Sequence, residues 1–332
     1  MKLMNKEIKN FLNDYLGTKN FELVPINKGG SDRAFFRVIV PDKTSFVFMH
    51  YGDEVEENAY WADINKFLAG IGISVPRIIA QDAKMHFILM EDLGDVDLYS
   101  QASLPWEKRR EFYFQALAQI YRLHSFYLIS IPFWLQLAES YGQKLYNWEH
   151  QYFLDNFVRE VCKINLSSAE IATLFKELDT LSERLQKIQP SLIHRDFQSQ
   201  NIMIKNGRPV MIDFQGTRRG NLYYDLGSLI CDPYVKFTTE ERTELIKFYY
   251  ELMNPACSFD EFVQNFWEAS AQRLMQALGA YGFLGSKKGK KEFLGHIDNG
   301  LDNLLMAVNN VERLEILGNL ATKCRVIVAR EK

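Results

Sequence analysis

The chain of 332 residues lacks the features typical of secreted, membrane-spanning or nucleic-acid-binding proteins. Its four cysteines are scattered, without the short spacings of a disulfide framework or a zinc site. Basic and acidic residues nearly cancel, and the net charge of −3 favours neither a nucleic-acid nor an anionic-membrane partner. The best candidate for a membrane span, Leu123 to Ala138, contains Pro132 and is shorter than the ~20 residues required. The charged N-terminus has no apolar signal-peptide stretch, so we expect a cytoplasmic protein.

The composition that remains is that of an ordinary globular protein. Apolar residues make up 47% and charged residues 24% of the chain, which excludes a disordered protein. The length corresponds to roughly two domains of about 150 residues each. The sequence has no internal repeats and no low-complexity segments.

The first ninety residues have the pattern of a helix followed by a small sheet. Apolar residues from Ile8 to Leu16 recur with helical spacing, and Gly17 stands where a helix commonly ends. A second helix is expected over 54–69, before two glycines. The other segments alternate like short strands and predict a five-stranded sheet formed by 21–26, 34–40, 45–50, 77–80 and 85–90.

Beyond Glu91 long helical patterns dominate, and several begin with the spacing of a capping box. These pairs are Ser167 with Glu170, Thr238 with Glu241 and Ser258 with Glu261. One hairpin interrupts the helices, because strand-like residues 201–204 and 209–213 flank the turn Asn206-Gly207. We therefore predict a bilobal α+β fold: a small five-stranded lobe in 1–92, a hinge near 90–94 and a larger, mainly helical lobe in 93–332.

Polar residues flank both arms of this hairpin in an order that indicates phosphoryl transfer. Asp196 precedes the first arm, Asn201 opens it, and Asp213 ends the second arm twelve residues later. Magnesium prefers oxygen ligands and keeps several waters, and an attacking hydroxyl needs a group that accepts its proton. We predict Asp196 as the base, with Asn201 and Asp213 as metal ligands. The alternative is that all three are surface, turn and strand-end residues.

The segment His194–Asn201, together with Asp213, resembles the catalytic and metal-binding loops of the aminoglycoside phosphotransferase and choline kinase family, which has a protein-kinase-like fold. Residues 192–235 are similar to bacterial cell-wall sugar kinases that phosphorylate the anomeric hydroxyl of N-acetylmuramate and N-acetylglucosamine. The resemblance covers nearly the whole chain. It implies an ATP- and Mg²⁺-dependent kinase whose small-molecule acceptor is an amino sugar. The alternative acceptors are an aminoglycoside, a choline-like amine or another metabolite.

The resemblance also implies where the nucleotide binds. Adenine would contact backbone groups of Glu91 and Leu93 in the hinge. The turn formed by Gly29, Gly30, Ser31 and Asp32 would cover the phosphates, because residues without bulky side chains let backbone N–H groups approach them. The same turn can also be an ordinary hairpin turn.

One element of the family pattern is missing. Kinases of this fold usually hold the phosphates with a lysine on the third strand, paired to a helix glutamate. Here that strand reads Phe-Val-Phe-Met-His over 46–50. We expect Arg37, or else Lys28, to replace the lysine. Because this lysine is missing, an alternative is that the protein is a pseudokinase, which binds partners but does not catalyse phosphoryl transfer.

The remaining candidates support the loop or line the acceptor pocket. His194, Arg195 and Asp225 are expected as support, with Asp225 as the N-cap of a helix over 226–230. A carboxylate on N-acetylmuramate would need an arginine, and Arg218 or Arg273 could supply it. The polar candidates for the acceptor pocket are Gln198, Gln215, Arg218, Asp232, Gln272 and Arg273. The sequence gives no oligomeric state.

Overall fold

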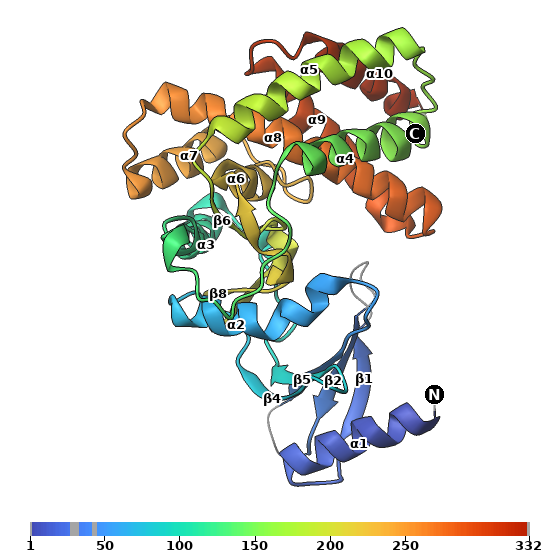
Figure 1. Cartoon of the computed structure of the whole chain (residues 1–332), viewed down its shortest axis with the longest axis vertical. Coiled ribbons are helices and arrows are strands. Elements are labelled where there is room, and N and C mark those ends of the chain that lie inside the picture. Colours follow the sequence, from blue (N-terminus) through green and yellow to red (C-terminus); the bar gives the residue numbers. More distant parts are fainter. Residues whose placement is uncertain (1, 27–32, 42–44, 331–332) are drawn as a thin grey trace.

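The computed structural model describes residues 2–26, 33–41 and 45–330 and divides into two lobes (Figure 1). The smaller lobe contains α1 (Lys2–Leu16) and an antiparallel sheet of order β1-β2-β3-β5-β4. Its strands are β1 (Glu22–Ile26), β2 (Ala34–Ile39), β3 (Phe46–His50), β4 (Ile78–Asp82) and β5 (Phe87–Glu91). The five-stranded lobe and the α+β fold are thus confirmed, whereas the division at residue 92 with a hinge at 90–94 stays a prediction.

The two faces of the sheet pack against different elements, because side chains alternate along a strand. On one face Phe48 and Phe87 lie against Phe11 of α1, with ring centroids 5.2–6.0 Å apart. On the other face Met49 and Ile88 belong to the large hydrophobic core that continues into the helical lobe. One face of the sheet is therefore turned toward the helical lobe.

The helix expected over 54–69 is divided in the structure. Residues Glu56–Tyr60 form a 3₁₀ turn, and α2 covers Trp61–Gly70. In the 3₁₀ turn the Tyr60 hydroxyl donates to Glu56, while Glu57 accepts from Arg218 of the helical lobe at 2.8 Å. The departure from the prediction accompanies a contact between lobes, which no local sequence pattern encodes.

The helical lobe is built around α8 (Phe259–Gly282), which is buried along most of its length. It packs on α4 (Gln143–Phe153), α6 (Leu222–Ile230) and α9 (Ile297–Asn309). Gly227 lets α6 approach α8 closely, because a Cβ at this position would lie 2.9 Å from the Ser270 Cα. Around these helices lie α3 (Trp106–His124), α5 (Ser168–Lys187), α7 (Thr239–Met253) and α10 (Glu315–Arg330).

The predicted capping boxes are found at the starts of these helices. Ser167 and Glu170 at α5, and Thr238 and Glu241 at α7, exchange both hydrogen bonds of the box. At α8 the Ser258 hydroxyl accepts from the Glu261 N–H at 3.2 Å, which is the first half of the box. These bonds satisfy N–H groups that a helix start leaves without partners.

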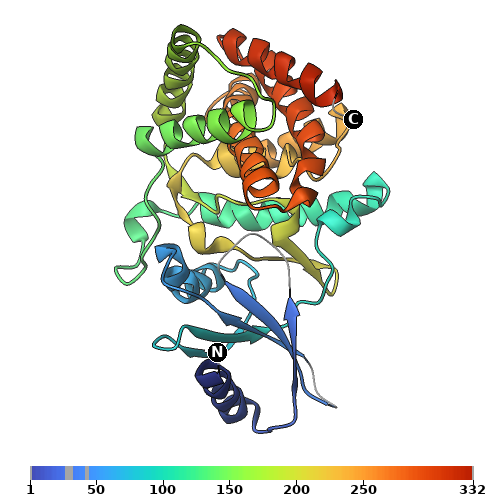
Figure 2. The ribbon, with the colours of Figure 1, turned by 90° about the vertical axis from the view of Figure 1, so that its right-hand side faces the viewer.

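Two short antiparallel pairs lie between the sheet and the helices (Figure 2). Strand β6 (Ser191–Ile193) pairs with β9 (Arg218–Gly220), and β7 (Ile202–Lys205) pairs with β8 (Arg208–Met211). The second pair is the predicted hairpin, and its turn residues Asn206 and Gly207 have φ of 52° and 74° as a two-residue turn requires. These pairs carry the predicted catalytic residues to the region between the lobes.

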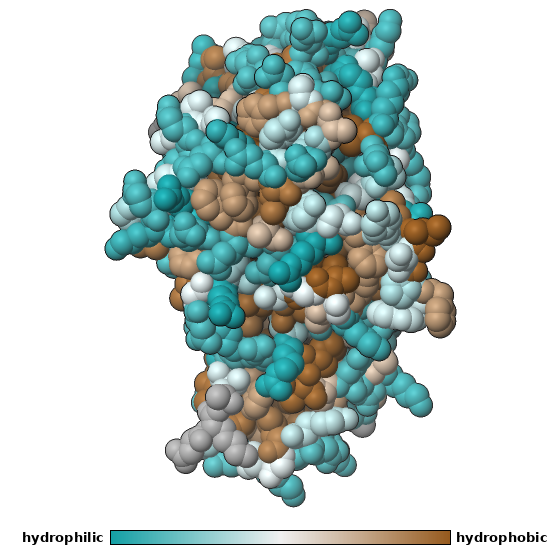
Figure 3. Space-filling model, turned by 90° about the vertical axis from the view of Figure 1, so that its left-hand side faces the viewer, coloured by the Kyte–Doolittle hydropathy of each residue, from teal (hydrophilic) through white to brown (hydrophobic). Residues whose placement is uncertain are grey.

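The surface of the protein is mixed in polarity. Figure 3 shows one face on which apolar side chains form several separate patches among hydrophilic ones. Ile129 and Phe133, between α3 and α4, are among the most exposed large apolar residues. Within the described ranges, no helix combines the length and apolar character that crossing a bilayer requires. The four cysteines are free, as expected from their spacing.

Candidate active site

The loop of residues 194–201, called the 194–201 loop below, is held by one buried carboxylate. Asp225 is fully buried and accepts from the backbone N–H groups of His194 at 2.6 Å and Arg195 at 2.8 Å. It also lies 3.0 Å from Nε2 of His124, whose Nδ1 lies 2.6 Å from the Tyr249 hydroxyl. Asp225 therefore joins the loop to α3, and through His124 to α7.

The predicted helix cap at Asp225 is wrong. Helix α6 begins at Leu222, and its N-cap is Asn221, whose side chain accepts from the Tyr223 N–H at 2.9 Å. Asp225 lies inside the helix, and its carboxylate is used by the loop. Because both Asn and Asp are good N-cap residues, the sequence alone did not distinguish the two positions.

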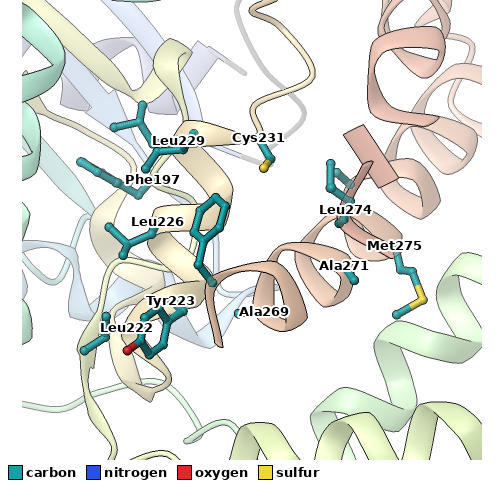
Figure 4. Close-up of a cluster of buried hydrophobic side chains, with 14 of the residues drawn as sticks. Phe197, Leu222, Tyr223, Leu226, Leu229, Cys231, Ala269, Ala271, Leu274 and Met275 are labelled. Atoms are coloured by element: carbon teal, nitrogen blue, oxygen red, sulfur yellow. The ribbon is translucent and has the colours of Figure 1, made fainter. Parts of the chain in front are cut away.

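The backbone before Asp196 has an unusual conformation. Arg195 has a φ of 79°, in the left-handed region that residues other than glycine rarely adopt. The bonds from Asp225 hold this conformation, and His194 Nε2 lies 3.0 Å from the Ile212 carbonyl at the end of the hairpin. Phe197, on the other side of Asp196, is buried beside Leu226 and Leu229 (Figure 4). Asp196 is thus fixed on both sides by the core of the helical lobe.

The structure brings the three predicted catalytic and metal-binding residues together. The Asn201 side-chain amide donates to the Asp196 carbonyl at 2.9 Å and lies 3.5 Å from Asp213 Oδ2. Asp213 also has a left-handed φ, of 61°, at the point where the chain leaves the hairpin. A hydrogen bond at 3.1 Å from the Gln215 side chain reaches Asp213 Oδ1. The Asn201 amide therefore lies between the backbone of Asp196 and the carboxylate of Asp213.

Two arginines approach the Asp196 carboxylate, one at each oxygen. Arg195 Nη1 lies 3.8 Å from Oδ2, and Arg273 Nη2 lies 3.9 Å from Oδ1. The Asp196 side chain keeps 28% of its surface exposed, whereas the Arg273 side chain is 6% exposed. The carboxylate is therefore accessible to a small hydroxyl compound, which would enter between two positive charges.

Asp213 is suited to hold a divalent cation together with Asn201. Burial alone would raise the pKa of Asp213, but the charge of Arg33 and hydrogen bonds from Arg33 and Gln215 hold it below its usual range. In the described residues no group of three or more His, Cys, Asp and Glu side chains could hold a metal. One carboxylate and one amide oxygen nevertheless fit Mg²⁺, because this ion takes its other ligands from phosphates and water.

Part of the predicted nucleotide site lies outside the described residues. Gly29, Gly30, Ser31 and Asp32, like Lys28, fall in the segment 27–32 of which no structure is given. The next residue, Arg33, is the cation that sequence reasoning missed: it donates to Asp213 Oδ1, and to Gln215 Oε1 at 2.8 Å. Its position directly after the predicted phosphate-covering turn was the available sequence signal.

The structure argues against the predicted phosphate contact of Arg37. The Arg37 guanidinium donates to Asp92 at 2.7 Å and to Asp95 at 2.9 Å, both in the segment after β5. Hydrogen bonds to Asp95 and Asp92 also raise the pKa of Arg37. Strand β2 thus places this arginine beside the hinge, where two carboxylates neutralise it.

A pocket of about 300 Å³ lies at the end of β5, where the hinge is predicted, and its lining includes Ser45, Phe46, Arg77, Glu91, Asp92 and Lys205. Lys205 at the end of β7 donates to the Glu91 carboxylate at 2.6 Å and to the Asp92 carbonyl at 2.8 Å. These bonds connect the hinge to the hairpin that carries Asn201. Adenine contacts at the backbone of Glu91 and Leu93 stay a prediction.

Three of the predicted acceptor residues lie beside Asp196 or Asp213. Arg273 Nη2 donates to Gln198 Oε1 at 3.3 Å, so both side chains lie beside Asp196. The Arg273 Nε donates to the Ser228 hydroxyl at 2.9 Å, which anchors the guanidinium on α6. Gln215 lies between Arg33 and Asp213. These positions are compatible with acceptor or phosphate binding.

The other three predicted acceptor residues already have internal partners. Arg218 is 3% exposed and donates to Glu57, Asp232 is buried and accepts from the Ser199 N–H at 2.8 Å, and Gln272 is buried. Burial raises the pKa of Asp232, and its bonds to Ser199 shape the 194–201 loop. Acceptor contacts by these residues stay a prediction, and each side chain would have to leave an internal partner or a buried position to make one.

A buried carboxylate below the loop was missed entirely. Glu149 of α4 is fully buried and accepts from the Tyr141 and Tyr224 hydroxyls at 2.8 Å and from Gln272 at 2.9 Å. Burial raises its pKa, although these hydrogen bonds and the charge of Arg195 act in the other direction. Glu149 lies in an ordinary amphipathic helix pattern, so nothing in the sequence distinguished it.

The chain belongs to the phosphotransferase enzyme family, which residues 22–279 match, and it is therefore an enzyme that transfers phosphoryl groups. This confirms the family resemblance found in the 194–201 loop. Curated relatives carry the name N-acetylmuramate/N-acetylglucosamine kinase. The relative from Pseudomonas aeruginosa is 27% identical over 305 residues, covering 90% of this chain and 87% of its own. The relative from Neisseria meningitidis is 24% identical over 306 residues, covering 90% and 89%.

Solved structures show the same fold at lower identity. A choline kinase from Cryptosporidium parvum superposes with a TM-score of 0.62 at 15% identity, covering 94% of this chain and 98% of its own. An ADP-bound aminoglycoside phosphotransferase superposes with a TM-score of 0.59 at 16% identity, covering 90% and 97%. These likenesses confirm the kinase-like bilobal fold.

Proposed function

We propose that this enzyme transfers the γ-phosphoryl group of ATP to the anomeric hydroxyl of an N-acetylated amino sugar. The observation that carries the proposal is the convergence of Asp196, Asn201 and Asp213 between the lobes, joined by contacts of 2.9 and 3.5 Å through Asn201. The names of the curated relatives support the acceptor class. A cytoplasmic location accompanies this proposal, because the reaction consumes ATP.

In this mechanism Asp196 accepts the proton of the acceptor hydroxyl, while the oxygen of that hydroxyl bonds to the γ-phosphorus. The bond from that phosphorus to the β,γ-bridging oxygen breaks, and ADP leaves with the electron pair. Asn201 and Asp213 would hold magnesium, which when bound neutralises charge on the phosphate oxygens. The bonds from Asp225 and the core position of Phe197 keep Asp196 oriented through the transfer.

The charges around Asp196 favour an acceptor that is neutral or anionic. Arg195 and Arg273 lie within 3.9 Å of its carboxylate oxygens, and two guanidinium groups would repel a cationic aminoglycoside or choline. Arg273 is the candidate for the carboxylate of N-acetylmuramate, because it lies beside Asp196 and a planar guanidinium binds a carboxylate through two hydrogen bonds. To bind it, the guanidinium would exchange its present bonds to Gln198 and Gln276 for bonds to the sugar. Arg218 cannot take this role while it is paired with Glu57.

An acceptor panel tests the proposal. ADP release is measured with N-acetylglucosamine, N-acetylmuramate, choline and an aminoglycoside, each with ATP and Mg²⁺. We expect turnover with the amino sugars alone, and a product whose phosphate couples to the anomeric carbon in NMR spectra. Turnover with a cationic acceptor only, or with none, would overturn the proposal. Absence of both turnover and stabilisation by nucleotide would instead favour the pseudokinase alternative.

A further inference from the structure

We propose that Arg33 takes the place of the missing strand lysine and binds the phosphates of the nucleotide. The inference rests on the proposed use of ATP and adds a residue that neither the family match nor the names of the relatives assign. The observation behind it is that Arg33 extends from the sheet lobe to the Asp213 carboxylate and the Gln215 side chain.

Three contacts of Arg33 are on described residues. Its guanidinium donates to Asp213 Oδ1, donates to Gln215 Oε1 at 2.8 Å and lies over the Phe35 ring at 5.6 Å from the centroid. Its side chain is only 7% exposed. A buried guanidinium held in this way has lost much of its rotamer freedom before any ligand binds.

The contact with Asp213 places this charge next to a predicted metal ligand. A metal held by Asp213 and Asn201 in a kinase site also binds phosphate oxygens. Arg33 bonds Oδ1 of Asp213, whereas the Asn201 amide approaches Oδ2. Arg33 thus bonds one carboxylate oxygen, while the other oxygen lies on the side of Asn201, the second predicted metal ligand. A guanidinium beside that carboxylate is within reach of phosphate oxygens, which it binds as a fork.

Two other described cations near the sheet have partners elsewhere. Arg37 is paired with Asp92 and Asp95 in the segment after β5, and Lys66 of α2 lies over the Trp134 ring at 5.2 Å. Strand β3 carries no lysine or arginine. Among the residues that the structure describes in the smaller lobe, Arg33 is the cation bonded to a predicted metal ligand.

Nucleotide binding without turnover tests the role directly. Calorimetric titrations with Mg²⁺ compare a non-hydrolysable β,γ-methylene analogue of ATP with adenosine, which has no phosphates. Arg33→Met should weaken analogue binding by about tenfold to a hundredfold, the usual effect of losing a charged hydrogen bond. Adenosine affinity should stay the same. Arg33→Lys should fall between, because lysine keeps the charge but not the fork.

Lys84→Met is the matched control, since it removes an exposed positive charge from the same lobe and should leave both affinities unchanged. Analogue affinity of Arg33→Met within about twofold of wild type would overturn the inference, as would equal losses for analogue and adenosine. If the wild-type protein binds neither compound, the proposed function fails and this inference fails with it. If wild type binds the analogue and Arg33→Met binds it equally well, only this inference fails.

Discussion

Arg218 of β9 donates to the Glu57 carboxylate across the two lobes at 2.8 Å, with the arginine side chain 3% and the glutamate side chain 32% exposed. In kinases of this fold a helix glutamate usually pairs with a lysine on the third strand, and strand β3 of this chain has no lysine. Here the partner of Glu57 is an arginine from the larger lobe. The pair therefore links the 3₁₀ turn before α2 to the segment that follows Asp213.

Removal of Glu57 should destabilise the protein, because it leaves the buried Arg218 guanidinium without a carboxylate, with two backbone carbonyls and the Tyr141 ring as its described partners. We expect Glu57→Ala to lower the free energy of unfolding by about 1–3 kcal/mol, less than for a fully buried pair because Glu57 is partly exposed. Urea unfolding measures the change, with Glu54→Ala as an exposed control in the same segment. A double variant with Arg218→Met should recover part of the loss. Equal effects of both glutamate substitutions would contradict the assigned pair.

Asp225→Asn should reduce catalysis without abolishing nucleotide binding. The variant replaces a carboxylate that accepts two backbone N–H groups, so the strained Arg195 conformation loses its support and Asp196 shifts. Misplacement of a catalytic group by about 1 Å can cost roughly a hundredfold in rate, and we expect a loss of kcat of this order.

Tyr249→Phe is the matched control for Asp225→Asn. It removes the other hydrogen bond of His124 but leaves both bonds between Asp225 and the 194–201 loop. Its kcat should stay close to that of wild type. Similar losses of kcat in the two variants would show that general damage to the buried network, and not the loop, is responsible.

Arg273→Met should change the preference between the two amino sugars. N-acetylmuramate carries a carboxylate and N-acetylglucosamine does not, so the variant should raise KM for the former about tenfold to a hundredfold more than for the latter. Arg273 also lies 3.9 Å from Asp196, so kcat is expected to change for both sugars alike. The ratio of kcat/KM values isolates the effect on the carboxylate. An unchanged ratio would remove Arg273 as the specificity residue.

The stability of the protein should depend on the ionisation of Glu149. Burial raises its pKa above the ordinary value of 4.5, so the folded protein favours the protonated carboxyl. The contribution of this group is fully present below pH 4.5 and is lost as the pH rises through its folded-state pKa. Glu149→Gln has no such loss.

Urea unfolding at several pH values tests this dependence. The free energy of unfolding of Glu149→Gln minus that of wild type should increase as the pH rises from about 4.5 toward 7. The increase should be at most ~1.4 kcal/mol per pH unit. A difference between the two proteins that is constant over this range would contradict the raised pKa. If Glu149→Gln instead became less stable relative to wild type as the pH rises, the pKa of Glu149 would be lowered and not raised.

Much of the fold and the centre of the site could be predicted from local patterns. The five strands, the Asn206-Gly207 turn and the caps at Ser167 and Thr238 depend on residues close in sequence, which are the interactions that such patterns record. The meeting of Asn201 with Asp213 followed from the hairpin, because its two arms bring them together.

Several predicted site residues instead contact partners that are distant in sequence. Arg218 is bound to Glu57 across 161 positions, and Gln272 to Glu149 across 123. The hydrophobic periodicity of a sequence does not indicate pairs of residues so far apart. Arg37 was predicted to bind the phosphates because it lies on the strand next to the one that lacks the lysine, but the register of that strand places it beside Asp92. Tertiary packing decided all three cases.

The most direct test of the central claim combines turnover and binding for a single substitution, Asp196→Asn. The variant keeps the size of the side chain but loses the carboxylate that accepts the hydroxyl proton. We predict that kcat with ATP, Mg²⁺ and an amino sugar falls by about 10²–10⁴-fold, while affinity for the non-hydrolysable ATP analogue stays within about twofold. Turnover by Asp196→Asn at the wild-type rate would contradict the assignment of Asp196 as the base.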